Sequence, residues 1–371
     1  MTRIVALVSA SGLTSLSRKT HRGDRNHRAV ERVVDRTIDP EGAFLVSSKL
    51  FTRSLAVLVA ATAAGFLLPA AASARSSVRV GIGDQSPAMF AAPQFKQLQI
   101  KRTRYFVPAD VMRDGAERAR ARAFVLAARS AGVSTLLHVS TADLRAKRGA
   151  RVSKSRYRRD ARRLVEYFRA LGVRDFGAWN EVNHKSQETW NRVGHAVSYY
   201  KDMYRAVRDR CRKCGVVGLD VLDQDGVERY MRSFYGRLSR TWRKRLKVVG
   251  IHNYADVNRR RTSGTRTIIR TARAYNRSTK FWFTETGALA SFQSNFRYSE
   301  ARQASRIKNM FSLASRFKRQ GVQRVYSYNW FGIENGGCGS RCRFDAGLVD
   351  PSGSPRAVYG VFKRKLRGYS R

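Results

Sequence analysis

From Val78 onward, short apolar runs rich in β-branched and aromatic residues alternate with longer, more polar stretches. The short runs predict buried strands. In the longer stretches apolar residues recur every three or four positions, as Leu164, Phe168 and Leu171 do, and this spacing predicts amphipathic helices. Strands are expected at residues 78–83, 103–107, 135–139, 175–179, 216–220, 247–252, 280–284 and 324–329. The clearest helices are expected at residues 116–131, 155–171, 187–211 and 300–319.

Strands that alternate with helices indicate βαβ units and a parallel sheet. Eight such units fit a (β/α)8 TIM barrel, which typically needs about 250 residues. The alternative is a doubly wound open sheet, which usually carries a glycine-rich phosphate loop after its first strand. Here the first strand is followed by Asp84 and Gln85, and no GxGxxG motif is present. Without a linker or an internal repeat, the sequence predicts one barrel domain over residues 75–371.

The residues before this domain have a different composition. Residues 55–74 are uncharged and apolar, follow a basic stretch, and end in Ala72-Ser73-Ala74. This pattern predicts a secretory signal peptide at residues 49–74, cleaved near Ala74, and therefore a secreted or cell-surface protein. An uncleaved membrane anchor over residues 55–74 is the alternative, because about 20 apolar residues can span a bilayer. Residues 1–48 are polar and Arg-rich, and they are either an extension or the result of a start assigned too far upstream.

The chain is strongly basic, with 73 Lys and Arg against 27 Asp and Glu and a net charge of +46. Such a charge favours nucleic acid or other anionic partners. The basic residues are spread along the whole chain, mostly on the outward faces of the predicted helices, whereas a nucleic-acid site gathers them on one element or module. We therefore expect a basic shell that adheres to anionic polymers such as cell-wall polymer, and no specific nucleic-acid site. Arg259-Arg260-Arg261, close after Tyr254, is a separate candidate for binding an anionic substrate.

The four cysteines form two close pairs in the sequence, Cys211 with Cys214 and Cys338 with Cys342. Such spacing occurs in zinc sites, but an exported protein favours disulfides. Of the three connectivities that four cysteines allow, we expect the two local ones. No HExxH, Walker or GxSxG motif is present, so metalloprotease, nucleotide-hydrolase and serine-hydrolase activities lack support.

Functional side chains of (β/α)8 barrels stand at the C-terminal ends of the strands. Only two of the predicted strand ends carry a glutamate, Glu181 after the fourth strand and Glu285 after the seventh. Two carboxylates over one barrel mouth, surrounded by Trp, Tyr, His and Asn, are what retaining glycoside hydrolysis requires. One carboxylate attacks the anomeric carbon, and the other protonates the leaving oxygen and later activates water.

These motifs resemble those of clan A retaining glycoside hydrolases, the (β/α)8 enzymes that include cellulases, mannanases and xylosidases. The resemblance covers roughly residues 78–367 and rests on Asn180-Glu181 within AWNEVNH and Glu285 within WFTETGAL. It implies that Glu181 is the acid/base and Glu285 the nucleophile, with no cofactor and no metal. No individual family is identified.

The resemblance also implies substrate-binding roles for other strand-end residues. Arg104 would lower the pKa of the nucleophile, and Tyr254, in the motif that begins with His252, would hydrogen-bond it. Trp330 would form a platform for sugar, or else cap the barrel core. Asn180 would orient the sugar or Glu181. Further candidates at the strand ends are His138, His184 and Asp84, whereas Asp220 and Asp223 are interpreted as loop caps.

The sequence thus predicts a secreted, monomeric retaining glycoside hydrolase that acts on an oligo- or polysaccharide, with an anionic one included. A non-catalytic carbohydrate- or cell-wall-binding barrel is one alternative, and a basic protein that binds nucleic acid or anionic surfaces is another. The geometry of the two glutamates separates these hypotheses. A retaining mechanism needs carboxyl groups about 5–5.5 Å apart and fails if they are more than about 10 Å apart.

Overall fold

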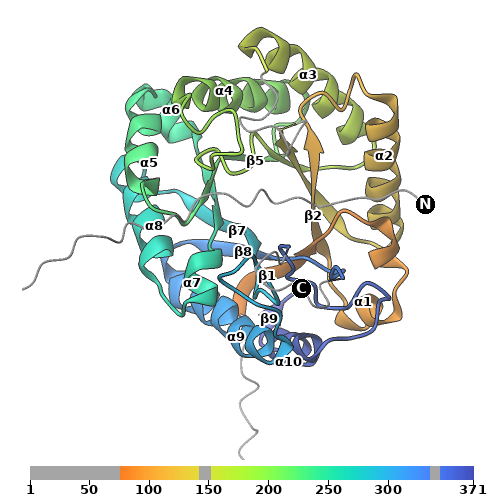
Figure 1. The fold of residues 1–371 in the computed structure, drawn as a ribbon. Coiled ribbons are helices and arrows are strands. Elements are labelled where there is room, and N and C mark those ends of the chain that lie inside the picture. Colours follow the sequence, from red (N-terminus) through yellow and green to blue (C-terminus); the bar gives the residue numbers. More distant parts are fainter. Residues whose placement is uncertain (1–75, 142–151, 335–342) are drawn as a thin grey trace, which may run out of the picture. The chain divides into compact units, whose positions relative to one another are not determined.

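The computed structural model describes residues 76–141, 152–334 and 343–371. Within them, eight parallel strands form a closed barrel with helices around it (Figure 1). Each strand pairs with the next one along the chain, and β1 pairs with both β8 and β2, which closes the sheet. The strands are β1 (Ser76–Gly83), β2 (Arg102–Pro108), β3 (Ser134–Ser140), β4 (Asp175–Gly177), β5 (Gly215–Leu222), β6 (Val248–His252), β7 (Lys280–Thr286) and β8 (Val322–Tyr328). The predicted (β/α)8 barrel and its eight strands are confirmed.

The helices are α1 (Pro93–Leu98), α2 (Gly115–Ser130), α3 (Lys154–Ala170), α4 (Val193–Arg210), α5 (Val227–Gly236), α6 (Arg240–Arg245), α7 (Tyr254–Asn258), α8 (Ser263–Tyr275), α9 (Glu300–Phe317) and α10 (Ala357–Leu366). Short 3-10 helices lie at Pro87–Phe90 and Lys318–Gln320, and a two-residue strand, β9 (Tyr369–Ser370), pairs with β1. The chain ends beside the strand with which the barrel begins.

Side-chain caps and apolar stripes explain where these helices form. Ser153 accepts a hydrogen bond from the backbone of Arg156 at the start of α3, as serine does at helix N-termini. The buried apolar residues of α3 recur mostly at steps of three and four and face the barrel; they are Tyr157, Ala161, Leu164, Val165 and Phe168. Its arginines at positions 158, 159, 162 and 163 point outward and are exposed. One helix therefore contributes both to the core and to the basic surface.

The start of α4 differs from the prediction. The expected helix began at residue 187, but α4 begins at Val193. Polar side chains in residues 187–192 bond elsewhere: Gln187 accepts from the indole of Trp179 at 3.0 Å, and Thr189 donates to the carbonyl of Val182 at 2.9 Å. These bonds hold the segment as turns against the end of β4, because side-chain hydrogen bonds compete with the helical ones.

Apolar and cationic packing closes the lower end of the barrel, at the N-terminal ends of the strands. A separate buried cluster there consists of Leu136, Val217, Val248, Trp282 and Tyr326. The guanidinium of Arg324 stacks on Trp282, 3.7 Å from the ring centroid, and pairs with Asp175 at 2.6 Å. Polar side chains inside the barrel gather at the opposite end, where substrates bind in this fold.

Several predictions concern residues outside the described ranges. These are the extension at residues 1–48, the signal peptide at residues 49–74, the alternative anchor at residues 55–74 and the Cys338–Cys342 disulfide. The Cys211–Cys214 disulfide is confirmed and links the end of α4 to the segment before β5. In the ranges that the structure describes, no helix is both long enough and apolar enough to cross a membrane.

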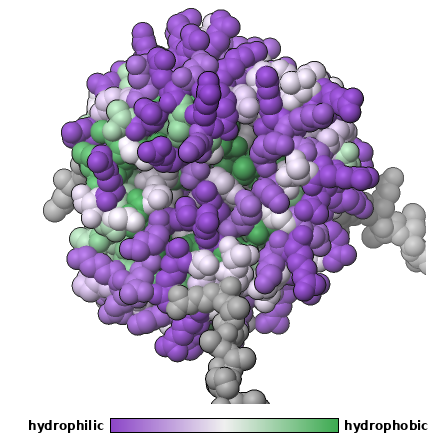
Figure 2. All heavy atoms as spheres, turned by 180° about the vertical axis from the view of Figure 1, so that it is seen from behind, coloured by the Kyte–Doolittle hydropathy of each residue, from purple (hydrophilic) through white to green (hydrophobic). Residues whose placement is uncertain are grey.

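The face shown in Figure 2 is largely hydrophilic, and apolar side chains occur there only in small scattered areas. On the surface as a whole, exposed arginines of α2 and α3 contribute to the basic shell that the sequence predicts, among them Arg120, Arg122 and Arg158. The spread of the charge matches a solvated surface better than a single basic groove.

Candidate active site

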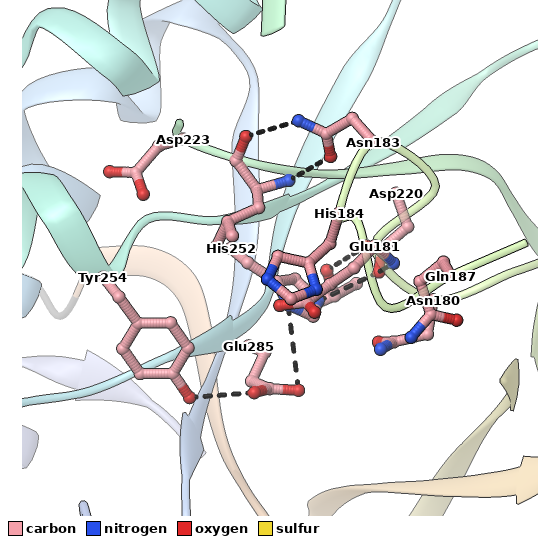
Figure 3. A network of polar contacts seen from close by, with 12 residues as sticks. Asn180, Glu181, Asn183, His184, Gln187, Asp220, Asp223, His252, Tyr254 and Glu285 are labelled. Carbon is pink, nitrogen blue, oxygen red and sulfur yellow. Dashed lines mark hydrogen bonds and ion pairs between the residues drawn. The ribbon is translucent and has the colours of Figure 1, made fainter. Parts of the chain in front are cut away.

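Glu181 and Glu285 come together at the C-terminal end of the barrel (Figure 3). Glu285 lies in β7, and Glu181 follows β4 in a short loop. One carboxylate oxygen of each and one ring nitrogen of His252 all lie within 4.8 Å of one another. The two carboxylates therefore face the same space, although 104 positions separate them in the sequence.

Both oxygens of Glu285 have a hydrogen-bond donor. Arg104 donates from Nη1 to Oε2 at 2.7 Å, and the hydroxyl of Tyr254 donates to Oε1 at 3.0 Å. Arg104 also donates to the side-chain oxygen of Asn180. Burial alone would lower the pKa of Arg104, but the charges of Glu285 and Asp220 raise it, so the guanidinium stays charged. This arrangement stabilises an ionised, oriented carboxylate on Glu285.

Glu181 has a different environment. Its Oε1 is 2.9 Å from Nδ1 of His252, and its backbone N–H points to Asp220 Oδ2 at 3.4 Å. Burial would raise the pKa of Glu181, but the hydrogen bond from His252 and the charge of that ring hold it below its usual value. The backbone φ of Glu181 is +45°, a left-handed conformation that is uncommon for glutamate and recurs at functional sites.

A polar layer lies directly beneath the two glutamates. Asp220 Oδ2 is 2.9 Å from His252 Nε2 and 3.7 Å from His138 Nε2, and Thr284 donates its hydroxyl to Asp220 Oδ1. Asp220, His138 and His252 are each 0% exposed. Gly250 makes room for this layer, since a Cβ at that position would lie 1.8 Å from Asp220 Oδ1. The side chains are thus fitted into the barrel rather than solvated.

The pKa values of the two buried histidines, His138 and His252, are shifted in opposite directions. Burial lowers the pKa of His138 to about 3, so its ring is neutral, and its Nδ1 accepts from Arg104 Nε at 3.4 Å. Burial would also lower the pKa of His252, but Asp220 and Glu285 raise it to about 10. His252 is therefore an imidazolium at neutral pH.

Two of the predicted binding residues lie elsewhere. Trp330 is 0% exposed and packs edge-to-face against Phe95 of α1 and Tyr359 of α10, so it occupies the core position that was the alternative to a sugar platform. Asp84 accepts from the backbone of Gln85 and Ser86 and from that of Trp330 and Phe331. Burial raises the pKa of Asp84 to about 6 despite these donors. Asp84 thus links the end of β1 to the loop after β8 through hydrogen bonds to both segments.

An aromatic residue that the sequence analysis did not select takes the place beside the glutamates. Tyr328, the last residue of β8, is buried, and burial followed by the charge of Glu285 raises its pKa well above the ordinary value. Phe344 lies against it, with ring centroids 6.1 Å apart, and meets Tyr254 edge-to-face at 5.2 Å. The period-two alternation of β8 gives the signal: Tyr326 belongs to the lower cluster, and Tyr328 is the next inward position.

The loops around the site hold its remaining candidates. His184 contacts Ser186 Oγ through Nδ1 at 2.7 Å, and its backbone N–H bonds to the carbonyl of Glu181 at 2.8 Å. Asp223 accepts from the backbone of Ala255 and Asp256 at the start of α7, in keeping with a cap. Arg260 donates to Ser305 of α9 at 3.0 Å. Within the described residues, no hydrogen bond or ion pair joins Arg259, Arg260 or Arg261 to either glutamate.

The spacing of Glu181, His252 and Glu285 would also suit a divalent ion. Both oxygens of Glu285 already accept from Arg104 and Tyr254, and both ring nitrogens of His252 face carboxylates. The positive charge that a metal would supply is present as a guanidinium and an imidazolium. We therefore interpret the cluster as a network of ion pairs.

No family model matches the sequence, and no curated protein matches it either. Several solved structures share the fold. A glucosidase from Croceicoccus marinus superposes with a TM-score of 0.58 at 14% identity, over 80% of this chain and 66% of that chain. A monomeric β-xylosidase from Caulobacter crescentus gives 0.55 at 14% identity, over 77% and 67%. A family 1 β-glucosidase from Thermotoga maritima gives 0.54 at 11% identity, over 80% and 99%.

The chain thus spans about two thirds of the length of the first two of these structures. At such identities the likeness shows a shared (β/α)8 fold, which the resemblance in sequence motifs had implied. The activity has to be argued from the site itself.

Proposed function

We propose that the protein is a retaining glycoside hydrolase in which Glu285 is the nucleophile and Glu181 the acid/base. The observation that carries the proposal is the approach of their carboxylate oxygens to within 4.8 Å at one barrel mouth. Retaining enzymes keep their two carboxyl groups about 5–5.5 Å apart, whereas inverting ones need about 6.5–9.5 Å to admit water. One oxygen of each carboxylate within 4.8 Å of the other agrees with the closer, retaining arrangement and supports double displacement.

The environments of the two glutamates support this division of roles. Glu285 is ion-paired with Arg104 and hydrogen-bonded by Tyr254, so it is ready to attack the anomeric carbon as a carboxylate. As the covalent bond forms, the carboxylate of Glu285 becomes a neutral ester, and its hydrogen bonds from Arg104 and Tyr254 weaken. Water regenerates the free carboxylate in the second step.

Glu181 is suited to exchange protons. Its carboxylate contacts an imidazolium rather than a guanidinium, and an imidazolium, unlike a guanidinium, can pass a proton to a hydrogen-bonded carboxylate. Glu181 would protonate the departing glycosidic oxygen and then remove a proton from the attacking water. Asn180, which accepts from Arg104, is placed beside it with its amide N–H2 available to a sugar hydroxyl.

The substrate is proposed to be an oligo- or polysaccharide with an O-glycosidic bond. Tyr254, Tyr328 and Phe344 form an aromatic wall beside Glu285, and aromatic rings stack on the apolar faces of sugars. The similar solved structures include a glucosidase and a β-xylosidase, which fits this substrate class. The basic shell would favour adhesion to anionic polymers near the substrate.

The activity is tested with a panel of aryl glycosides and polysaccharides. The wild type should hydrolyse at least one of them, and Glu285→Ala should lose about 10³-fold or more of kcat, as removal of a covalent nucleophile does in other hydrolases. Glu166→Ala is the matched control, because the Glu166 side chain is 64% exposed and pairs with Arg210 on the surface. Binding of a polysaccharide by the wild type without turnover would favour the non-catalytic carbohydrate-binding barrel.

We also propose that the protein is exported and that residues 49–74 are removed on the way. The support is the order of the parts in that segment: basic residues come first, an apolar run follows, and small residues end it. N-terminal sequencing of the protein recovered from culture medium should begin near Arg75. Recovery of the intact N-terminus in the membrane fraction would instead favour an anchor.

A further inference from the structure

Asp220, His252 and Glu181 form a continuous chain inside the barrel (Figure 3). Asp220 Oδ2 lies 2.9 Å from His252 Nε2, and Glu181 Oε1 lies 2.9 Å from Nδ1. Asp220 and His252 are 0% exposed, and Glu181 is 7% exposed. Asp220 lies within β5 and points into the barrel, rather than capping the loop after that strand.

Carboxylates at both ring nitrogens restrict where the protons can be. In a neutral imidazole, one ring nitrogen would hold a bare lone pair only 2.9 Å from a carboxylate oxygen, and the two negative partial charges would repel each other. Either His252 is doubly protonated, or one carboxyl carries the proton instead. Asp220 is the worse place for it, because Thr284 donates to its other oxygen and the backbone N–H of Glu181 points to it.

The charges around His252 lead to the same conclusion. The groups that face it are Arg104 on β2, His138 on β3, Glu181 after β4, Asp220 on β5, and Thr284 and Glu285 on β7, with Tyr254 and Tyr328 beside Glu285. Asp220 and Glu285 carry two negative charges and Arg104 one positive charge. One further proton shared between His252 and Glu181 leaves a single net negative charge in this buried cluster.

We propose that Asp220 and His252 hold the proton that Glu181 delivers to the leaving group. This inference rests on the proposed function. In the resting site His252 is an imidazolium and Glu181 a carboxylate. When sugar displaces water, the proton moves from Nδ1 to Glu181, because a neutral pair is favoured over an ion pair in a dry site.

The proton count balances through both steps. In the first, Glu285 forms its bond to the anomeric carbon, the glycosidic bond breaks, and the leaving oxygen takes the proton from Glu181. The negative charge has then moved from Glu285 to Glu181, and His252 is neutral. In the second, Glu181 takes a proton from water, the oxygen of water bonds to the anomeric carbon, Glu285 leaves as a carboxylate, and the proton returns to His252. The cluster keeps one net negative charge in each state.

Asp220 is a positioning residue in this scheme, since it touches neither sugar nor water. Its carboxylate faces Nε2 and so leaves Nδ1 for the exchange with Glu181. Without that charge, His252 would become neutral at lower pH, and Glu181 would lose the source of its proton.

The charge of His252 can be read without any substrate. The ¹⁵N chemical shifts of its ring should be those of an imidazolium at pH 7 in the wild type and those of a neutral ring in Asp220→Asn. Asp160→Asn is the matched control, because Asp160 is a buried carboxylate on α3 that pairs with Arg113 away from the site. A neutral His252 in the wild type, or the same imidazolium in Asp220→Asn, would overturn the proposal.

The transfer step is read from activity. Asp220→Asn should lose about 10²-fold in kcat/KM on substrates with poor leaving groups, within the range of general acid catalysis. The kcat/KM of this variant on dinitrophenyl glycosides should change little, because such leaving groups need no acid. The alkaline limb of the pH profile of the variant should move to lower pH. Thr284→Val, which removes a donor to Asp220, should act in the same direction more weakly and serves if Asp220→Asn does not fold. If the wild type is active and the variants keep both its alkaline limb and its leaving-group dependence, the proposed proton transfer from His252 to Glu181 is wrong, but the proposed function stands. If the wild type is inactive, both proposals are wrong.

Discussion

Arg104 on β2 and Glu285 on β7 form a buried ion pair across the barrel, with 2.7 Å between Nη1 and Oε2. Their side chains are 1% and 6% exposed. Pairs of this kind add little net stability when complete, but removing one partner leaves an uncompensated charge in a dry site. The pair therefore connects the stability of the barrel with the reactivity proposed for Glu285.

Arg104→Met should be both destabilised and inactive. Loss of the guanidinium is expected to cost about 3–5 kcal/mol of unfolding free energy, because Glu285 stays buried without its counter-charge. Urea denaturation at pH 7 measures this. Arg162→Met removes an arginine that is 67% exposed and pairs with Asp209 at 3.8 Å, and it should cost less than about 1 kcal/mol. Equal decreases in unfolding free energy in the two variants would contradict the stabilising role of the guanidinium beside Glu285.

Stability should fall as the pH rises above neutrality, because His252 binds its proton more tightly in the folded state. Burial lowers the pKa of His252, but Asp220 and Glu285 raise it from 6.5 to about 10. A group with a raised folded-state pKa stabilises fully below its unfolded value and loses that contribution as the pH passes through the folded value. The free energy of unfolding should thus decrease between about pH 6.5 and pH 10.

The difference between wild type and His252→Gln isolates this contribution, since tyrosines and lysines also titrate near pH 10. Urea unfolding at pH 6.5 and pH 9.5 should give a steeper decrease for the wild type than for the variant. His195→Gln serves as control, because burial and the neighbouring Arg192 lower the pKa of His195 instead. Parallel profiles for the wild type and His252→Gln would contradict the charge assigned to this ring.

Trp330 and Phe344 should have different roles. Trp330→Leu is expected to lower stability by about 2–4 kcal/mol, since it leaves a cavity against Phe95 and Tyr359, with KM unchanged. Phe344→Ala is expected to raise KM about tenfold, in line with about 1–1.5 kcal/mol for an aromatic contact, with little loss of stability. Michaelis kinetics and thermal unfolding of both variants test this contrast. A raised KM in Trp330→Leu alone would restore the platform role to Trp330.

Glu181→Ala should show the behaviour of a missing acid/base. Its kcat/KM should fall most for poor leaving groups, because those need protonation. Added azide should restore turnover on activated glycosides, since it attacks the glycosyl-enzyme without base assistance. Proton NMR of the product should show a glycosyl azide with the anomeric configuration of the substrate. A glycosyl azide of inverted configuration would indicate that Glu181 is the nucleophile.

The sequence predicted the barrel well because each strand is a short apolar run that the local sequence alone distinguishes from its polar surroundings. All eight strands form near the expected residues. The start of α4 was wrong, because Gln187 and Thr189 bond back to the end of β4. Those bonds are tertiary contacts, and local periodicity does not contain them.

For the site, the sequence selected Glu181 and Glu285 because they are the only glutamates at the predicted strand ends. It did not identify Asp220 as a partner of His252, since the fifth strand was expected to end at that residue. β5 continues to Leu222, and so the carboxylate of Asp220 lies inside the barrel. Trp330 was chosen over Tyr328 for a similar reason: the inward direction of a side chain at a strand end depends on where the strand stops.

Covalent trapping tests the central claim most directly. A 2-deoxy-2-fluoro glycoside with a dinitrophenyl leaving group, matched to a sugar that the wild type hydrolyses, should inactivate the enzyme by accumulating the glycosyl-enzyme. Mass spectrometry of the digested protein should then find the fluorosugar on the peptide that contains Glu285, and Glu181→Ala should be labelled at the same residue. A label on any other residue, or rapid turnover with inversion and no label, would contradict the assignment of Glu285 as the nucleophile of a retaining hydrolase.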